Sequence, residues 1–160
     1  MNTQEVIDFQ NKMDESLDKF LLEKGVIREK FAIKPIGYLS WLEEEFPKGE
    51  VPVEFVSKLR LIWNTGLTLC SLGLHTCEFC NNATGSSEKI LIDKVNKIKY
   101  IFPELIFHYM EVHKFKPSDE FIDFIMKFDI NDLHVPEFDS KNIGNILERN
   151  KINRAMKRRK

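Results

Sequence analysis

Most of the histidines and cysteines of this chain lie in two short stretches. The first reads HTCEFC and the second, 28 residues further on, reads HYMEVH. Together they contain His75, Cys77, Cys80, His108 and His113, and only Cys70 and His134 lie elsewhere. Thiolate sulfur and imidazole nitrogen are the ligands that Zn²⁺ prefers, usually as a tetrahedral set of four. The two stretches therefore predict a zinc site.

The predicted ligands are Cys77, Cys80, His108 and His113. A Cys-x2-Cys pair places two thiolates on one side of a tight turn, and two thiolates balance the charge of Zn²⁺ in a buried site. His75 is an alternate ligand, or a residue that supports a ligand through a hydrogen bond. Two other interpretations of the cysteines are a redox dithiol and a pair of inert reduced thiols. The redox motif belongs at the start of a helix that follows a strand, whereas this pair precedes the loop NNATGSS.

The spacing of the two later histidines sets a geometric condition. Five residues of an ideal helix rotate by about 500°, so His108 and His113 lie roughly 140° apart and do not share a face. Pro117 limits the length of this helix, so we expect His113 in or near its last turn, where the backbone can unwind. A hairpin between Cys80 and His108 is expected to fold the chain back so that the two pairs meet.

The elements that must position these residues follow from hydrophobic periodicity and capping signals. We expect a first helix that is capped by Asn2 with Glu5 and runs to about Lys24, then a short helix capped by Ser40 with Glu43, and a third helix from Pro52 to Gly66. A hairpin of KILID and IKYIF is expected to follow, and then a helix from Pro103 and a helix capped by Ser118. This order predicts a single, mainly helical α+β domain with a zinc knuckle and a short antiparallel β-hairpin. We expect the domain to span residues 1–148, with an N-terminal helix at 1–25, a core at 36–128 and a basic tail at 149–160.

Composition restricts the setting. The length of 160 residues and the 42% hydrophobic content fit one globular domain. The sequence shows neither a secretory signal nor a long apolar run, so we expect a cytoplasmic protein with reduced thiols. The net charge of −1 conceals an asymmetry, because residues 149–160 carry seven basic residues and no acidic one. These are Arg149, Lys151, Arg154, Lys157, Arg158, Arg159 and Lys160, and they are candidate contacts to nucleic acid.

Three segments resemble a set of small, mostly uncharacterised bacterial proteins. They are IGYLSWLEEEFPKGEVPVEFVSKLRLIW, LGLHTCEFC and KYIFPELIFHYMEVHKFKPSDEFIDFI. The shared pattern is an H-x-C-x2-C knuckle followed by a P-x-L-I-x-H-Y-x3-H helix, and it covers about residues 36–126. It falls on His75, Cys77, Cys80, Tyr100, Pro103, His108, Tyr109 and His113. The resemblance implies a common fold and a zinc-binding site, and it implies no activity. One departure is Pro117-Ser118, where the family often has two prolines.

Three functions fit these observations. The first is a non-enzymatic interaction or regulatory protein stabilised by structural zinc, such as an adaptor or an antitoxin or immunity-type partner. The second is a nucleic-acid-binding regulator that uses the basic tail, although the rest of the chain is acidic. The third is a zinc-dependent hydrolase with Glu78 or Glu111 as the base, but the H-E-x-x-H motif is absent. We expect a protein partner and no membrane association.

Overall fold

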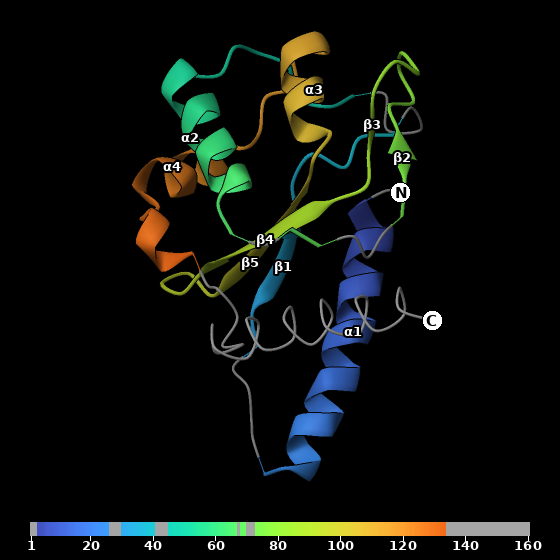
Figure 1. The fold of residues 1–160 in the computed structure, drawn as a ribbon, viewed down its shortest axis with the longest axis vertical. Coiled ribbons are helices and arrows are strands. Elements are labelled where there is room, and N and C mark those ends of the chain that lie inside the picture. The colour runs from blue at the N-terminus through green and yellow to red at the C-terminus, as the bar shows by residue number, and fades with distance from the viewer. Residues whose placement is uncertain (1–2, 26–29, 41–44, 67, 70–72, 134–160) are drawn as a thin grey trace, which may run out of the picture.

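A three-stranded sheet lies at the centre of the computed structural model (Figure 1), which describes residues 3–25, 30–40, 45–66, 68–69 and 73–133. Its order is β1 (Ala32–Pro35), β5 (Ile98–Pro103) and β4 (Glu88–Asp93). Strands β4 and β5 form the predicted antiparallel hairpin. Strand β1, which the periodicity did not indicate, pairs with β5 in parallel. The mixed sheet and its covering helices confirm the α+β class.

The two faces of the sheet carry different layers. Because side chains alternate along a strand, Tyr100 and Phe102 face one side and Ile101 the other. The first side packs against α2 (Val53–Asn64), α3 (Ile106–Val112) and α4 (Asp119–Lys127). Its fully buried side chains include Phe55, Leu59, Ile62, Tyr100, Phe102, Ile106, Phe121 and Ile125. This side therefore holds the main core.

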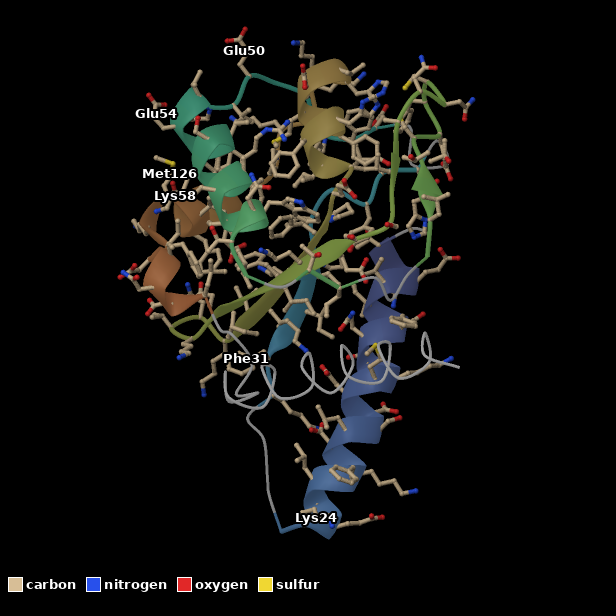
Figure 2. All side chains as sticks on the ribbon, in the orientation of Figure 1. Lys24, Phe31, Glu50, Glu54, Lys58 and Met126 are labelled. Carbon is tan, nitrogen blue, oxygen red and sulfur yellow. The ribbon has the colours of Figure 1, made fainter. Side chains whose placement is uncertain are left out.

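Helix α1 (Thr3–Glu23) covers the other face only in part. Val6 packs with Tyr38 and Ile101 in a second, smaller core. In the second half of the helix Met13, Leu17 and Phe20 are 43–54% exposed. Figure 2 places Lys24 at the end of α1 that projects beyond the sheet. The predicted helix is thus present, while Asn2 of its expected cap lies outside the described residues.

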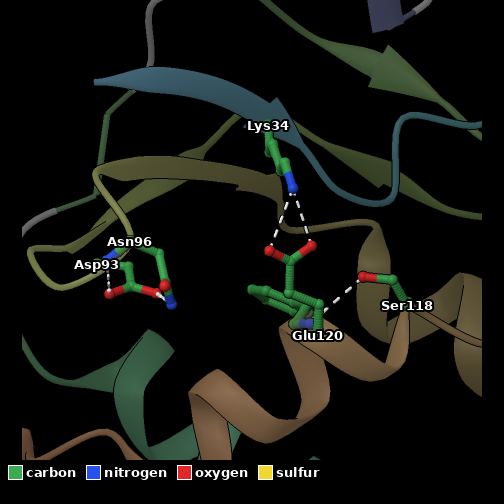
Figure 3. A network of polar contacts seen from close by, with 6 residues as sticks. Lys34, Asp93, Asn96, Ser118 and Glu120 are labelled. Carbon is green, nitrogen blue, oxygen red and sulfur yellow. Dashed lines mark hydrogen bonds and ion pairs between the residues drawn. The ribbon is translucent and has the colours of Figure 1, made fainter. Parts of the chain in front are cut away.

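Helices α2 and α4 begin where the sequence predicted, and α3 does not. Helix α2 follows Pro52, and Ser118 caps α4, its Oγ accepting a hydrogen bond from the Phe121 amide at 3.3 Å (Figure 3). The expected start of α3 at Pro103 is wrong. Pro103 ends β5, and the Glu104 amide still donates to the Ser87 carbonyl at 2.9 Å, so the chain keeps its strand-like path before the helix begins.

The short helix expected after Ser40 falls largely on residues 41–44, which lie outside the described residues. The segment that follows is not helical. The Gly49 amide donates to the Lys114 carbonyl and the Lys116 amide donates to the Pro47 carbonyl, both at 2.9 Å. This segment therefore pairs with the chain that leaves α3.

A lysine links the hairpin to α2. The Lys89 side chain projects from β4 toward the end of α2, and its Nζ donates to the carbonyl oxygens of Ile62 at 2.6 Å, Trp63 at 3.0 Å and Thr65 at 2.5 Å. The last carbonyls of a helix have no partner within the helix and carry partial negative charge. Lys89 is 2% exposed, and burial lowers its pKa from the ordinary value of 10.5.

Candidate metal centre

The two cysteines lie on a turn whose ends are held together. Strand β2 (His75–Thr76) pairs with β3 (Thr84–Gly85) in an antiparallel ladder. Within this loop the Cys77 amide donates to the Ala83 carbonyl at 2.8 Å, and the Asn81 amide donates to the Cys77 carbonyl at 2.9 Å. Asn81 takes the left-handed conformation, with φ of 56°, that closes the turn. Both Cys77 and Cys80 are free thiols.

The two histidines meet because α3 ends between them. His108 lies inside α3, whereas His113 is the capping residue, with φ of −102° and ψ of 4°. The Tyr109 carbonyl accepts hydrogen bonds from the amides of His113 at 3.1 Å and Phe115 at 3.0 Å, and Lys114 has φ of 58°. This end brings the two imidazole rings to a centroid distance of 5.0 Å. The prediction that His113 lies where the helix can unwind is confirmed.

Four potential ligand atoms come together at this point. The distance from Cys77 Sγ to His113 Nε2 is 3.3 Å, and the distance from Cys80 Sγ to His108 Nε2 is also 3.3 Å. All four atoms lie within 4.8 Å of one another. A tetrahedral zinc ion with bonds of about 2.3 Å to sulfur and about 2.05 Å to nitrogen requires sulfur–nitrogen separations of about 3.5 Å. The group therefore has the dimensions of a Cys2His2 metal site.

The electrostatics favour the neutral imidazole at His113, whereas the thiolate of Cys77 depends on the metal ion for its stabilisation. Burial raises the pKa of the Cys77 thiol, and hydrogen bonds from the amides of Cys80 and Phe79 act in the opposite direction. Burial, with smaller contributions from His108 and Lys48, lowers the pKa of His113. A metal ion stabilises the thiolate form directly, so binding releases protons from the cysteines.

Aromatic side chains pack against the His113 side of the group. The Phe79 ring, between the two cysteines, packs against His113 with centroids 5.3 Å apart and against Phe46 at 5.4 Å. Phe46 in turn contacts Phe115 at 6.1 Å. These contacts limit the access of water to His113. The sequence offered a signal for Phe79, its position inside Cys-x2-Cys, but none for Phe46.

Among the described residues, the structure brings no other predicted site residue into this group. His75 is on β2, outside the group of four, and its Nε2 is buried without a hydrogen-bond partner among the described residues. Its predicted role as a substitute or supporting ligand stays a prediction. Glu78 and Glu111 are exposed. Cys70, His134 and the seven basic residues of 149–160 lie outside the described residues.

The fold and the site define a small α+β domain with a Cys2His2 group that can hold a metal ion. A family model described as a domain of unknown function, DUF7919, matches residues 15–126, and the chain belongs to this family. The match includes all four residues of the metal group. The chain matches no curated protein and no solved structure. Within the described residues, no helix combines the length and apolarity needed to cross a membrane.

Proposed function

We propose that this protein is a non-enzymatic interaction or regulatory protein whose fold is stabilised by one structural zinc ion. The observation that carries the proposal is the convergence of four side chains, from segments about 30 residues apart, on one point. Cys77 and Cys80 are paired with His113 and His108 at 3.3 Å in each case.

Zinc is the ion that this donor set fits best. Two thiolates and two imidazoles in a tetrahedral arrangement suit Zn²⁺, whereas Mg²⁺ and Ca²⁺ prefer oxygen ligands. Cys77, Cys80, His108 and His113 would hold the ion. The two thiolates would leave the site without net charge, which suits its partly buried position.

A structural role is favoured because the protein supplies all four ligands. Catalytic zinc sites keep one position open for water or substrate and place a base beside it. Here the four side chains would fill all four positions, and Glu111, the acidic residue between the two histidines, is exposed. The zinc-dependent hydrolase is therefore the weaker alternative.

The ion would join two parts of the chain that already pack together at the edge of the main core. On one side is the knuckle, residues 75–85, and on the other is the end of α3, which is also paired with residues 47–49. Binding energy at such a site contributes directly to folding. We infer that zinc fixes a surface for a cytoplasmic protein partner, of the adaptor or antitoxin and immunity type.

Metal content tests the proposed ion. Protein purified without chelator is expected to contain one equivalent of zinc by mass spectrometry of the metal, and Cys77→Ser is expected to lose it. Cys70→Ser is the matched control, because it removes a thiol outside the four proposed ligands. Less than half an equivalent in the unaltered protein contradicts the proposal.

A second pair of variants assigns the histidines. His108→Gln is expected to lower zinc affinity at least tenfold, whereas His75→Gln leaves it unchanged. Cobalt substitution gives a further check, because tetrahedral Co²⁺ bound by two thiolates has strong visible absorption that weakens when a ligand is lost. Equal losses in the two variants would assign His75 to the metal site.

A structural role is separated from a catalytic one by following fold and activity together. Removal of zinc with a chelator is expected to abolish the near-ultraviolet circular dichroism of the aromatic residues around the site. Glu111→Gln is expected to change neither the fold nor the zinc content. A hydrolytic activity that depends on both zinc and Glu111 would refute the non-enzymatic assignment.

A further inference from the structure

A small cavity of about 160 Å³ lies between the β2–β3 ladder, the segment that follows β1 and the residues that end β5. Tyr109 of α3 forms part of its wall and also packs against Phe79 of the metal centre, with ring centroids 6.2 Å apart. The described residues that line the cavity include none of the four proposed metal ligands. The cavity is therefore a neighbour of the metal centre and is distinct from it.

Two residues of the cavity wall each carry a buried polar atom that has no hydrogen-bond partner among the described residues. These atoms are the hydroxyl oxygen of Tyr38 and Nε2 of His75. Tyr38 is only 7% exposed, and burial, with the negative charge of Glu88 acting in the same direction, raises the pKa of its hydroxyl. The hydroxyl is therefore protonated at neutral pH. Because buried polar atoms in proteins are nearly always paired, two such atoms at one cavity indicate a polar occupant.

The charged groups of the cavity wall are acidic. Glu88, at the start of β4, is 2% exposed, and Glu78 and Glu104 line the cavity with exposed side chains. Gly85 leaves room for Glu104, because a methyl group at Gly85 would lie 3.3 Å from Glu104 Oε2. The described lining residues include neither lysine nor arginine. A wall that carries one sign of charge favours an occupant of the opposite sign, here a cation.

The volume and the apolar part of the wall restrict the occupant further. The leucines of the wall are Leu39, Leu74 and Leu105. Two tyrosines, Tyr38 and Tyr109, also line the cavity, and aromatic rings attract organic cations. A cavity of about 150 Å³ holds a molecule of the size of benzene, with about six non-hydrogen atoms. The wall therefore suits a small organic molecule with one charged end and one apolar end.

We propose that this cavity binds a small primary amine. The ammonium group donates hydrogen bonds to the Tyr38 oxygen and to His75 Nε2, and the carboxylate of Glu88 balances its charge. The short alkyl part lies against the leucines. Because the segment after β1 supplies Tyr38 and the knuckle supplies His75, the bound amine joins two segments that are far apart in the sequence.

Three probes of similar shape test the charge requirement. Isobutylamine, isobutanol and isobutyrate share one branched carbon skeleton and are positive, neutral and negative at neutral pH. Each is titrated into the labelled full chain, and amide and aromatic resonances are followed by NMR. We expect saturable shifts at Tyr38 and His75 with isobutylamine, about tenfold weaker binding of isobutanol and no saturable shift with isobutyrate. Equal binding of the amine and the alcohol, or no saturable shift with the amine, would overturn the proposal.

Removal of a single hydroxyl tests the location of the bound amine. Tyr38→Phe keeps the ring and its packing against Val6, and is expected to weaken isobutylamine binding at least fivefold. Tyr100→Phe is the matched control, because Tyr100 is a buried tyrosine of β5 that does not line the cavity. Amide resonances distant from the cavity show whether each variant keeps the fold. Equal affinities in the two variants would refute the assignment of the amine to this cavity.

Removal of the buried charge tests the role of Glu88. Glu88→Gln keeps the size of the side chain and is expected to abolish the preference for isobutylamine over isobutanol. A preference that survives in this variant would contradict the proposed charge balance. The comparison of the three probes in the unaltered chain does not depend on the folding of any variant.

Discussion

Replacement of Lys89 by methionine tests whether a buried ammonium group joins the hairpin to α2. Methionine retains most of the aliphatic length but cannot donate to the carbonyl oxygens at the end of the helix. In the variant, the Ile62 carbonyl still accepts a hydrogen bond from the Thr65 amide at 3.2 Å. The carbonyls of Trp63 and Thr65 lose the hydrogen bond from Lys89, and no such second donor compensates them within the described residues.

The expected cost follows from these contacts. A carbonyl that loses its partner away from water costs about 1–3 kcal/mol; the two bonds here are part-buried, so the lower half of this range applies, and the charge at the helix end contributes up to about 1 kcal/mol more. Part of this is returned, because the variant no longer buries a charge. We expect a net loss of about 3 kcal/mol in the free energy of unfolding, which lowers Tm by about 6–12 °C for a chain of this size.

Lys58→Met is the matched control. Lys58, on α2, donates to the Met126 carbonyl at 2.7 Å, but this bond lies at the surface, where water can replace it (Figure 2). Its loss is expected to cost less than about 1 kcal/mol. Urea unfolding of both variants, followed by circular dichroism, gives the comparison. If the two variants lose the same stability, the buried contact does not contribute as argued.

The same variant carries a pH signature. The pKa of Lys89 is lower in the folded protein than its ordinary value of 10.5, because burial penalises the ammonium form. Between these two values the unfolded chain binds more protons, so the Lys89 contribution to the free energy of unfolding rises with pH. The stability difference between the unaltered protein and Lys89→Met is therefore expected to grow from pH 7 to pH 10. A difference that shrinks over this range would contradict the assignment.

Two further predictions concern the metal centre and the turn after β1. Treatment with a chelator is expected to lower the Tm of the unaltered protein by more than about 10 °C, to the Tm of untreated Cys80→Ser, whereas Cys70→Ser keeps the Tm of the zinc-loaded protein. Scanning calorimetry measures these Tm values, and a Tm that a chelator does not change would count against a structural ion. Gly37→Ala is expected to cost about 2–4 kcal/mol, because φ is +82° and the new methyl group would lie 2.8 Å from the Ile106 side chain. Gly66→Ala, with φ of +80° and open space around it, is expected to cost only about 1 kcal/mol, and equal losses on chemical denaturation would refute the steric argument.

The sequence predicted the features that depend on local patterns. Two short β-rich runs in residues 89–102, separated by KVNK, are sufficient for the β4–β5 hairpin, and the spacing after Pro52 is sufficient for α2. The group of Cys77, Cys80, His108 and His113 followed from ligand chemistry, and its geometry depended on a helix end that the position of Pro117 indicated.

Features that depend on distant pairing were missed. Strand β1 is four residues long, and its burial does not alternate strongly, so nothing local distinguishes it from a loop. Its partner lies more than 60 residues away. The start of α3 was misplaced because Pro103 fits the first position of a helix, whereas here it is the last residue of the central strand β5, where it pairs with β4 beyond the end of β1. The contact of Phe46 with Phe79 likewise depends on the fold and has no sequence signal.

The parallel pairing of β1 with β5 has a consequence for the order in which the molecule assembles. The hairpin closes a short loop, whereas β1 can join β5 only after 62 intervening residues have been brought into a closed loop, which costs about 4 kcal/mol of chain entropy by the logarithmic term alone. Helix α1 contacts the sheet mainly through β1, so it is expected to dock last and to open first. Native-state hydrogen exchange should then find the amides of α1 and β1 exchanging together, well before those of the hairpin.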